Sequence, residues 1–415
     1  MRKIVLLTLL LAMSGLASAQ DTSTVAYTYH NPDGNSYFPD ATGTFPEVQQ
    51  IDAVLDTMPL WVVGGLVNGE PVWTVALLDG RVVTVDSTGA ITDLAQIAPE
   101  EPIAAIYDGE NAPTLLRASD DASPLSHPVR LPGGEVAYNA VNGDLVILRD
   151  DEEIARLPLN LQVDARLLIS DTGLLATYTD STVDRYVHAI MGDDAEAAGL
   201  AVIAVSVDDA GVNVVAQVTL PGDDIYEGIA PLWADIDDDG TQEIVTTVSN
   251  GSSGATIRVY EADGTVLADA VPIGQGFRWR QQIAVAPFGI NGETQLVDIR
   301  TPHIGGMVEF FDLEGDTLVV NNAQLGYTSH AIGSRNLDMG VAADFNGNGK
   351  PELVVTDHAR QNVTAVENTQ QGVTEVWRLP LDNTITTNIA AITLPDGTLA
   401  LAVGNRSGVL RIWQP

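Results

Sequence analysis

Two segments of the chain repeat one pattern, and this pattern restricts the folds that the chain can adopt. They read ADIDDDGTQEIV at residues 234–245 and ADFNGNGKPELVV at residues 343–355. In each segment an acidic loop of Asp, Asn and Gly leads directly into a β-rich apolar run. The first aspartates, Asp235 and Asp344, are 109 residues apart (344 − 235). An internal repeat of this kind predicts an array of similar structural units.

Weaker copies of the turn in this pattern recur along the chain. The residue before the key glycine is Asn or Asp in all five clear units. Turn chemistry explains that preference, because Asn and Asp tolerate left-handed φ and glycine accepts positive φ. The key glycines of the series, weak copies included, are Gly69, Gly109, Gly173, Gly240, Gly292, Gly349 and Gly397.

The spacing of this series predicts an all-β fold, a β-propeller. The glycines are about 55 residues apart on average, which fits a blade of four short antiparallel strands. We predict seven blades over residues 51–415; an eighth unit between residues 110 and 172 is the alternative. Two stacked β-sandwiches would not explain the repeat. Residues 20–50 are predicted to be an extended arm, although a strand from the mature N-terminus is expected to complete the last blade and remove exposed edges.

The first residues have the features of an export signal. A positively charged start precedes a short apolar run over residues 4–13, and residues 17–19 form a small-residue cleavage site. Residues 1–19 are therefore predicted to be a signal peptide. The chain contains no Cys, which excludes a lipid-anchored cysteine at the cleavage site. We expect a secreted or periplasmic protein.

The charge of the chain restricts its partners. There are 19 Lys and Arg residues against 56 Asp and Glu residues, a formal net charge of −37. Loss of Arg2 and Lys3 with the signal peptide leaves −39 (17 − 56). This field repels nucleic acid and anionic membrane surfaces, and no later stretch is long and apolar enough for a transmembrane helix. We therefore expect neither nucleic-acid binding nor membrane insertion.

Only two units carry additional oxygen ligands around the turn. In the other units the same places hold residues such as Gly64 and Leu66. A turn needs no extra oxygens, whereas Ca²⁺ takes six to eight, and alternate residues of a tight loop direct their side chains at one centre. We predict two Ca²⁺ sites, in which the residue after the glycine contributes its backbone carbonyl. The predicted ligands are Asp235, Asp237, Asp239, Thr241 and Glu243 in the first loop, and Asp344, Asn346, Asn348, Lys350 and Glu352 in the second.

The two loops differ from EF-hands but match another known pattern. Position twelve is Thr246 or Val355 rather than Glu, and a β-rich run follows where a helix should begin. DIDDDGTQE and DFNGNGKPE resemble the calcium loops of FG-GAP/VCBS repeats, the propeller units of integrin α-chains and of many exported bacterial proteins. The resemblance implies that each loop joins the first two strands of a blade. Glu at the ninth position and the lack of Phe-Gly…Gly-Ala-Pro flanks depart from the family pattern.

A basic surface is predicted on the face opposite these loops. There the connections between second and third strands, and those between blades, concentrate Arg and His over the last three blades. Arginine binds carboxylates or sulfates, and tryptophan stacks on a sugar face. The alternative is that each arginine pairs with a nearby acid. The candidate ligand-binding residues are Arg278, Trp279, Arg280, His303, His330, Arg335, His358, Arg360 and Arg406.

These features favour a binding or scaffold role, towards a partner protein or an extracellular polysaccharide. A polysaccharide lyase or hydrolase that uses His303, His330 or His358 is the alternative function. No H-x-x-x-H spacing, Ser elbow, Gly-rich phosphate loop or Cys nucleophile supports a particular chemistry. Convergence of the three histidines would favour the enzyme, and a scattered arrangement would exclude it.

The first loop is expected to bind Ca²⁺ more tightly than the second, because it carries four carboxylates and the second carries two. Calorimetric titration of the wild-type chain should resolve two unequal sites, and the Asp235→Ala variant should retain the weaker one. Equal affinities, or no binding to the variant, would contradict the assignment.

Overall fold

The computed structural model describes residues 23–186, 188–206 and 211–415. The predicted signal peptide, residues 1–19, lies outside these ranges. Every regular element in the described ranges is a β-strand, and none of the described residues forms a helix of the length and hydrophobicity needed to cross a bilayer.

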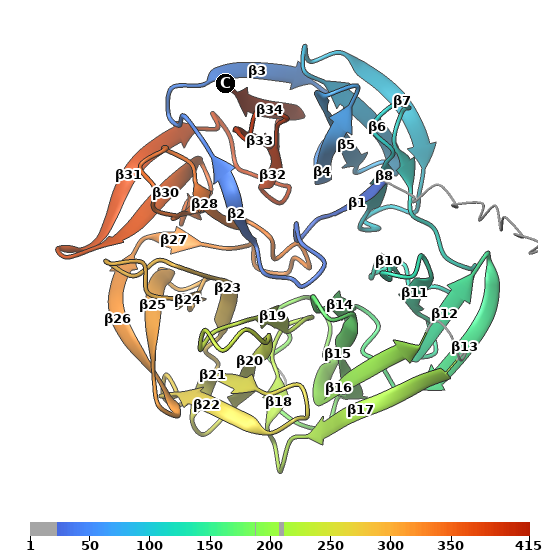
Figure 1. Cartoon of the computed structure of the whole chain (residues 1–415), viewed down its shortest axis with the longest axis vertical. Coiled ribbons are helices and arrows are strands. Elements are labelled where there is room, and N and C mark those ends of the chain that lie inside the picture. The colour runs from blue at the N-terminus through green and yellow to red at the C-terminus, as the bar shows by residue number, and fades with distance from the viewer. Residues whose placement is uncertain (1–22, 187, 207–210) are drawn as a thin grey trace, which may run out of the picture.

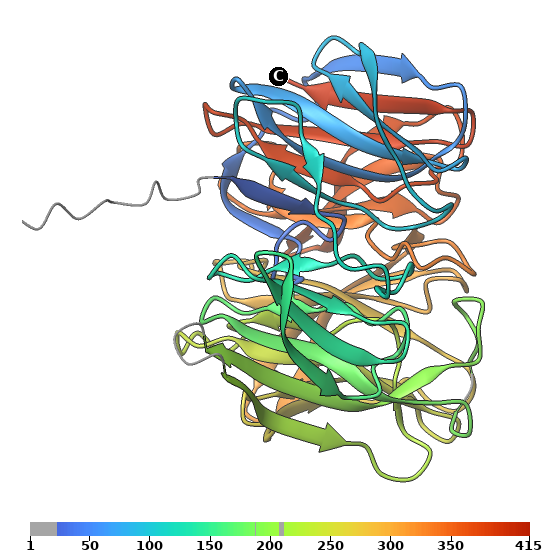
Figure 2. The ribbon, with the colours of Figure 1, turned by 90° about the vertical axis from the view of Figure 1, so that its right-hand side faces the viewer.

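Seven four-stranded antiparallel blades form a closed ring together with a three-stranded sheet, which packs between the first two of them (Figure 1). Figure 2 shows the ring from its edge. The first two blades are β4 (Pro59–Val67), β5 (Glu70–Leu77), β6 (Arg81–Asp86) and β7 (Ile91–Gln96), then β10 (Val129–Arg130), β11 (Val136–Asn139), β12 (Asp144–Arg149) and β13 (Glu152–Pro158). The next two are β14 (Leu168–Ile169), β15 (Leu174–Thr182), β16 (Glu196–Ser206) and β17 (Gly211–Thr219), then β19 (Leu232–Ala234), β20 (Glu243–Asn250), β21 (Gly254–Tyr260) and β22 (Val266–Ala270). The last three are β23 (Arg280–Ala286), β24 (Gln295–Arg300), β25 (Met307–Glu314) and β26 (Thr317–Leu325), then β28 (Gly340–Asp344), β29 (Glu352–Asp357), β30 (Asn362–Thr369) and β31 (Gly372–Pro380), and finally β32 (Ala390–Thr393), β33 (Leu399–Gly404), β34 (Val409–Gln414) and β3 (Gln49–Val54). The predicted all-β propeller of four-stranded antiparallel blades is confirmed; seven sheets of the ring have four strands and one has three.

Short additional strands lie between and within the blades. A three-stranded sheet is made of β1 (Thr24–Tyr27), β8 (Ala104–Tyr107) and β9 (Thr114–Leu115). The strand β2 (Tyr37–Thr42) runs parallel to β28. Two two-residue strands in blade-to-blade connections, β18 (Ile225–Tyr226) and β27 (Tyr327–Thr328), pair with the second strands β20 and β29.

The core lies between neighbouring blades. Second strands such as β20 are buried along almost their whole length, whereas outer strands such as β17 are mostly exposed or half-buried. One cluster joins Trp73 of the first blade to Ile412 of the last. Near-continuous apolar runs therefore form the inner strands, because both of their faces are covered by adjacent blades.

The glycine series locates the blades with one error. Six of the seven key glycines lie in turns between the first and second strands of blades, as expected. Gly109 instead lies between β8 and β9 of the small sheet, and the corresponding turn of the second blade contains Gly134, with φ of 92°. The Asn142-Gly143 pair joins β11 and β12, an ordinary hairpin within a blade.

The N-terminal strand closes the ring. The strand β3 pairs antiparallel with β34 from Gln49 opposite Gln414 to Val54 opposite Val409. It is the outermost strand of the last blade, so the chain ends meet in one sheet. The expected completion of the last blade is confirmed.

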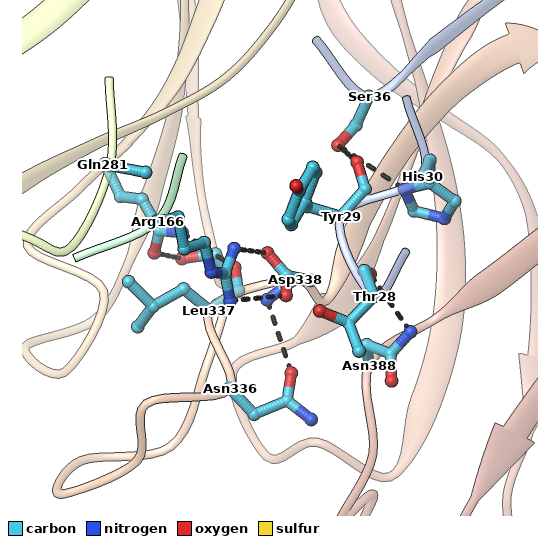
Figure 3. A network of polar contacts seen from close by, with 12 residues as sticks. Thr28, Tyr29, His30, Ser36, Arg166, Gln281, Asn336, Leu337, Asp338 and Asn388 are labelled. Atoms are coloured by element: carbon cyan, nitrogen blue, oxygen red, sulfur yellow. Dashed lines mark hydrogen bonds and ion pairs between the residues drawn. The ribbon is translucent and has the colours of Figure 1, made fainter. Parts of the chain in front are cut away.

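The segment expected to be an arm is part of the packed structure. The chain between β1 and β2 crosses the middle of the ring (Figure 1), where Tyr29 is 2% exposed. Arg166 lies over the ring of Tyr29, 5.2 Å from its centroid, and forms two 2.8 Å bonds to Asp338 (Figure 3). Asn388 donates to the carbonyls of Thr28 and Val62. Residues 27–38 therefore hold opposite blades together around the axis.

We expect the buried Arg166–Asp338 pair to be important for stability, because both side chains are less than a tenth exposed. Arg166→Ala should lower the free energy of unfolding by about 3–5 kcal/mol, since it leaves the Asp338 carboxylate buried without its partner. Urea denaturation measures this loss. In Arg117→Ala, a control that breaks an ion pair with a half-exposed arginine, the loss should stay below about 1 kcal/mol. Equal losses in the two variants would refute a special role for the central pair.

Candidate functional site

The first predicted calcium loop joins β19 to β20, the first and second strands of a blade. One carboxylate oxygen from each of Asp235, Asp237 and Asp239 lies within 4.8 Å of the other two. The backbone N–H of Asp239 donates to both Asp235 and Asp237, at 3.1 Å each. Positive φ at Asp238 (60°) and Gly240 (89°) folds the chain tightly enough to bring these side chains together.

The second loop, between β28 and β29, has the same geometry. The N–H of Asn348 donates to Asp344 and Asn346, at 3.0 and 2.9 Å. Positive φ recurs at the equivalent positions, Gly347 (75°) and Gly349 (85°). The two loops therefore share one backbone conformation although the second carries fewer carboxylates.

Each loop ends at a buried glutamate. Glu243 and Glu352 are 1% and 0% exposed, and each accepts the N–H of the second loop residue, Ile236 or Phe345. Burial is the main cause that raises the pKa of Glu243 to about 7 and that of Glu352 to about 8, and neighbouring carboxylates add to it. The second oxygen of Glu352, Oε1, is buried without a hydrogen-bond partner. A turn gives no reason for such an orphaned oxygen, whereas a cation does.

Two further carboxylates, which the sequence analysis missed, lie beside the loops. Continuation of the strand register places Glu261 opposite Glu243, and Glu367 opposite Glu352. Glu367 accepts the side-chain amides of Asn346 and Asn348, at 2.9 and 2.7 Å. Like charges directly opposite each other destabilise a sheet, so this pairing in both blades suits a hard cation with oxygen ligands. The available sequence signal was an acidic residue at the end of the third strand: Glu261 directly follows β21, and Glu367 lies near the end of β30.

The predicted basic face is only partly available for a ligand. The connections that carry it are, as expected, those between second and third strands and those between blades. Arg280 is 3% exposed and pairs with Asp298 and Glu309. Arg335 pairs with Asp164 and Asp193. These two arginines therefore have structural partners.

Three arginines of the face have no such partner. Across the described ranges, no hydrogen bond or ion pair is formed by the guanidinium groups of Arg278, Arg360 and Arg406. Arg278 and Arg406 are exposed, and Arg360 is half-buried. The backbones of Arg360 and Arg406 both bond to the connection at residues 384–385, which places the two loops side by side. Unpaired arginines are unexpected in a chain with so many acids, so they mark a candidate anion-binding surface.

Two of the three candidate histidines converge, together with Trp279. The rings of His303 and His330 lie 4.5 Å apart, and Trp279 lies 4.6 Å from His330. Burial is the main cause that lowers the pKa of His303 to about 4 and that of His330 well below its usual value, so both rings are neutral at pH 7. His358 lies outside this ring cluster and accepts the N–H of Gly305, at 3.2 Å.

A cavity of about 170 Å³ opens beside this cluster. Its lining includes Arg278, Trp279 and His303, and also His188, which the sequence analysis did not single out. His188 comes from the connection between β15 and β16, on the same face, and its Nδ1 is hydrogen-bonded to the buried Glu227. The sequence analysis considered only the connections of the last three blades. The same consideration of second-to-third-strand connections in all blades would have included His188.

Two solved structures resemble the chain over most of its length. One is a crystal structure of BBS1N in complex with ARL6DN, soaked with mercury, with a TM-score of 0.48 and 10% identity, covering 88% of this chain and 95% of that chain. The other is a structure of the Dos1 propeller, with a TM-score of 0.45 and 9% identity, covering 90% of this chain and 96% of that chain. No protein-family model and no curated protein matches the chain.

We expect Glu367 to contribute to cation binding at the second loop. Glu367→Gln should weaken Ca²⁺ binding there by about tenfold to hundredfold. Above the pKa of Glu352, about 8, the same change should not destabilise the calcium-free chain, because it removes the repulsion between the two carboxylates. Calorimetry and thermal unfolding in a chelator measure the two effects. Glu375→Gln in the outermost strand β31 is the control for the same loss of charge. An unchanged affinity in Glu367→Gln would contradict this role.

Proposed function

We propose that the chain is an exported, calcium-binding β-propeller of the FG-GAP/VCBS type that binds a partner protein through the face opposite the calcium loops. The observation that carries the binding role is the set of three unpaired arginines on this face, of which Arg278 lines the aromatic cavity. The export step rests on the signal-like residues 1–19, and determination of the mature N-terminus tests it: the protein should begin at Gln20.

Calcium supports this role by fixing the loops. At the first loop, the clustered carboxylates of Asp235, Asp237 and Asp239 repel one another unless a cation lies between them. At the second loop, the unpartnered oxygen of Glu352 is available as a ligand. Both loops join first and second strands, so bound cations would stabilise these blades at the face of the propeller opposite the partner surface.

The cavity rim favours a protein partner over a glycan. Three apolar residues at the cavity are strongly exposed: Phe277 (58%), Ile304 (70%) and Ile332 (68%). Exposed apolar groups next to arginine are typical of protein interfaces. Trp279 is only 2% exposed, so its ring is covered and does not offer the stacking surface for a sugar that the sequence suggested.

The enzyme alternative has weaker support. His303 and His330 form a pair rather than a triad with His358. His330 is 2% exposed, so it cannot reach a bound polysaccharide without a rearrangement. A binding role requires neither histidine to exchange protons.

Removal of the three free arginines tests the binding role. A variant with Arg278, Arg360 and Arg406 changed to Ala should bind a poly-L-glutamate peptide at least about tenfold more weakly than the wild type, because charge-assisted bonds are lost. The matched control changes Arg117, Arg156 and Arg378, which are ion-paired, and removes the same charge.

Oligogalacturonate is the glycan probe for the same variants, compared by calorimetry at about 0.15 M salt, where long-range forces are screened. Preference for the peptide supports a protein partner, and preference for the oligosaccharide would assign the face to glycans. Equal losses in both triple variants, or no binding of either probe to the wild type, would refute the proposal.

A further inference from the structure

The aromatic cavity has one well-positioned polar group on its lining. The ring of Phe277 stacks on His188 at 5.3 Å and on Tyr186 at 5.1 Å, and Trp279 and His303 continue the aromatic lining. Apart from the edges of His188 and His303 and the exposed Arg278, the side chains around the cavity are mainly apolar or aromatic. A planar, mostly apolar group fits such a site.

The orientation of the His188 ring is fixed by a hydrogen bond to a buried carboxyl group. Its Nδ1 is bonded to Glu227 Oε1, and Ser249 donates to the other oxygen of that carboxyl group. The side chains of Glu227 and His188 are 1% and 12% exposed, and Ser249 is fully buried. A histidine held in this way has a fixed ring position.

The other ring nitrogen of His188, Nε2, has no hydrogen-bond partner among the described residues. It lies on the opposite side of the ring from Glu227, and the residue lines the cavity. A hydroxyl group can bond to this nitrogen in either tautomer, since a hydroxyl both donates and accepts. The cavity therefore combines aromatic walls with a hydrogen-bonding position for a hydroxyl at His188 Nε2.

Positive charge around the cavity favours a bound ring that has acidic residues next to it. Arg278 lies on its lining, and the charge of Arg360 is close enough to lower the pKa of His303. Both guanidinium groups lack carboxylate partners within the described part of the chain. An acidic residue next to the inserted ring would supply the missing countercharge.

We propose that this cavity binds a tyrosine side chain of a partner protein, flanked by acidic residues. The phenol ring packs against Phe277 and His303, its hydroxyl bonds to His188 Nε2, and a neighbouring carboxylate pairs with Arg278. The inference rests on the proposed protein-binding function and specifies the residue that is recognised.

The hydroxyl gives the sharpest test, because phenylalanine fills the same space without it. The probes are three capped peptides, acetyl-Glu-Tyr-Glu-amide and its Phe and Ala counterparts, titrated into the full chain and followed by calorimetry. The wild type should prefer Tyr to Phe by about tenfold, since Phe leaves His188 Nε2 unpaired. The Ala peptide should bind weakest.

Matched variants separate recognition from general effects. His188→Ala should reduce the Tyr-to-Phe ratio to about one, whereas His358→Ala, outside the cavity, should preserve it. Arg278→Ala should weaken the Tyr and Phe peptides equally, and Arg117→Ala should weaken neither. Circular dichroism and thermal unfolding verify that each variant is folded.

The outcomes distinguish this inference from the broader proposal. A wild-type ratio near one, or a ratio that persists in His188→Ala, would overturn tyrosine recognition even if acidic peptides still bind through the arginines. If no acidic peptide binds, both the inference and the proposed protein-binding function fail. Binding of oligogalacturonate alone would likewise overturn the inference and assign the face to a glycan.

Discussion

Closure of the ring by the N-terminal strand is the constraint on which the rest of the structure depends. The ladder between β3 and β34 removes the open sheet edges that a linear array of blades would expose. Residues 27–38 reinforce it from inside, where the Arg166–Asp338 pair and the bonds of Asn388 link distant blades. Strand alternation within each blade sets the face on which a connection lies, and closure fixes the positions of connections from neighbouring blades relative to one another, so both candidate sites depend on it.

The two faces differ in their charged groups because they are built from different connections. Turns between first and second strands carry the clustered oxygens of the two acidic loops. On the other face, acids such as Asp298, Asp164 and Glu227 are buried and engaged with Arg or His. This internal pairing removes negative charge from that surface, and the free arginines can then act on a ligand despite the acidity of the whole chain.

The sequence predicted what depends on local chemistry. Turns with Asn-Gly or Asp-Gly pairs located five blades, Thr172-Gly173 located a sixth, and the alternating oxygens located both loops. It did not locate the second four-stranded blade, because local chemistry does not distinguish the turn of a blade from other tight turns. Asp108-Gly109 forms a tight turn like the others but lies in the small sheet, whereas the turn of the blade has Gly134 preceded by Gly133 rather than by Asn or Asp. Contacts set by distant partners were also missed, because the pairing of β2 with β28 and the positions of Glu367 and His188 require the register and the closed ring.

The course of the N-terminal segment has a consequence for how the protein is made. Thr28 meets Asn388, 360 positions along the chain, and Asp52 meets Arg411, 359 positions along it. During synthesis, therefore, the N-terminal residues cannot form these contacts until the C-terminal residues have been made. Contacts between such remote positions slow folding and leave strand edges uncovered in the interval. The growing polypeptide thus passes through a stage in which the last blade still lacks its outermost strand and the edge of that sheet is uncovered.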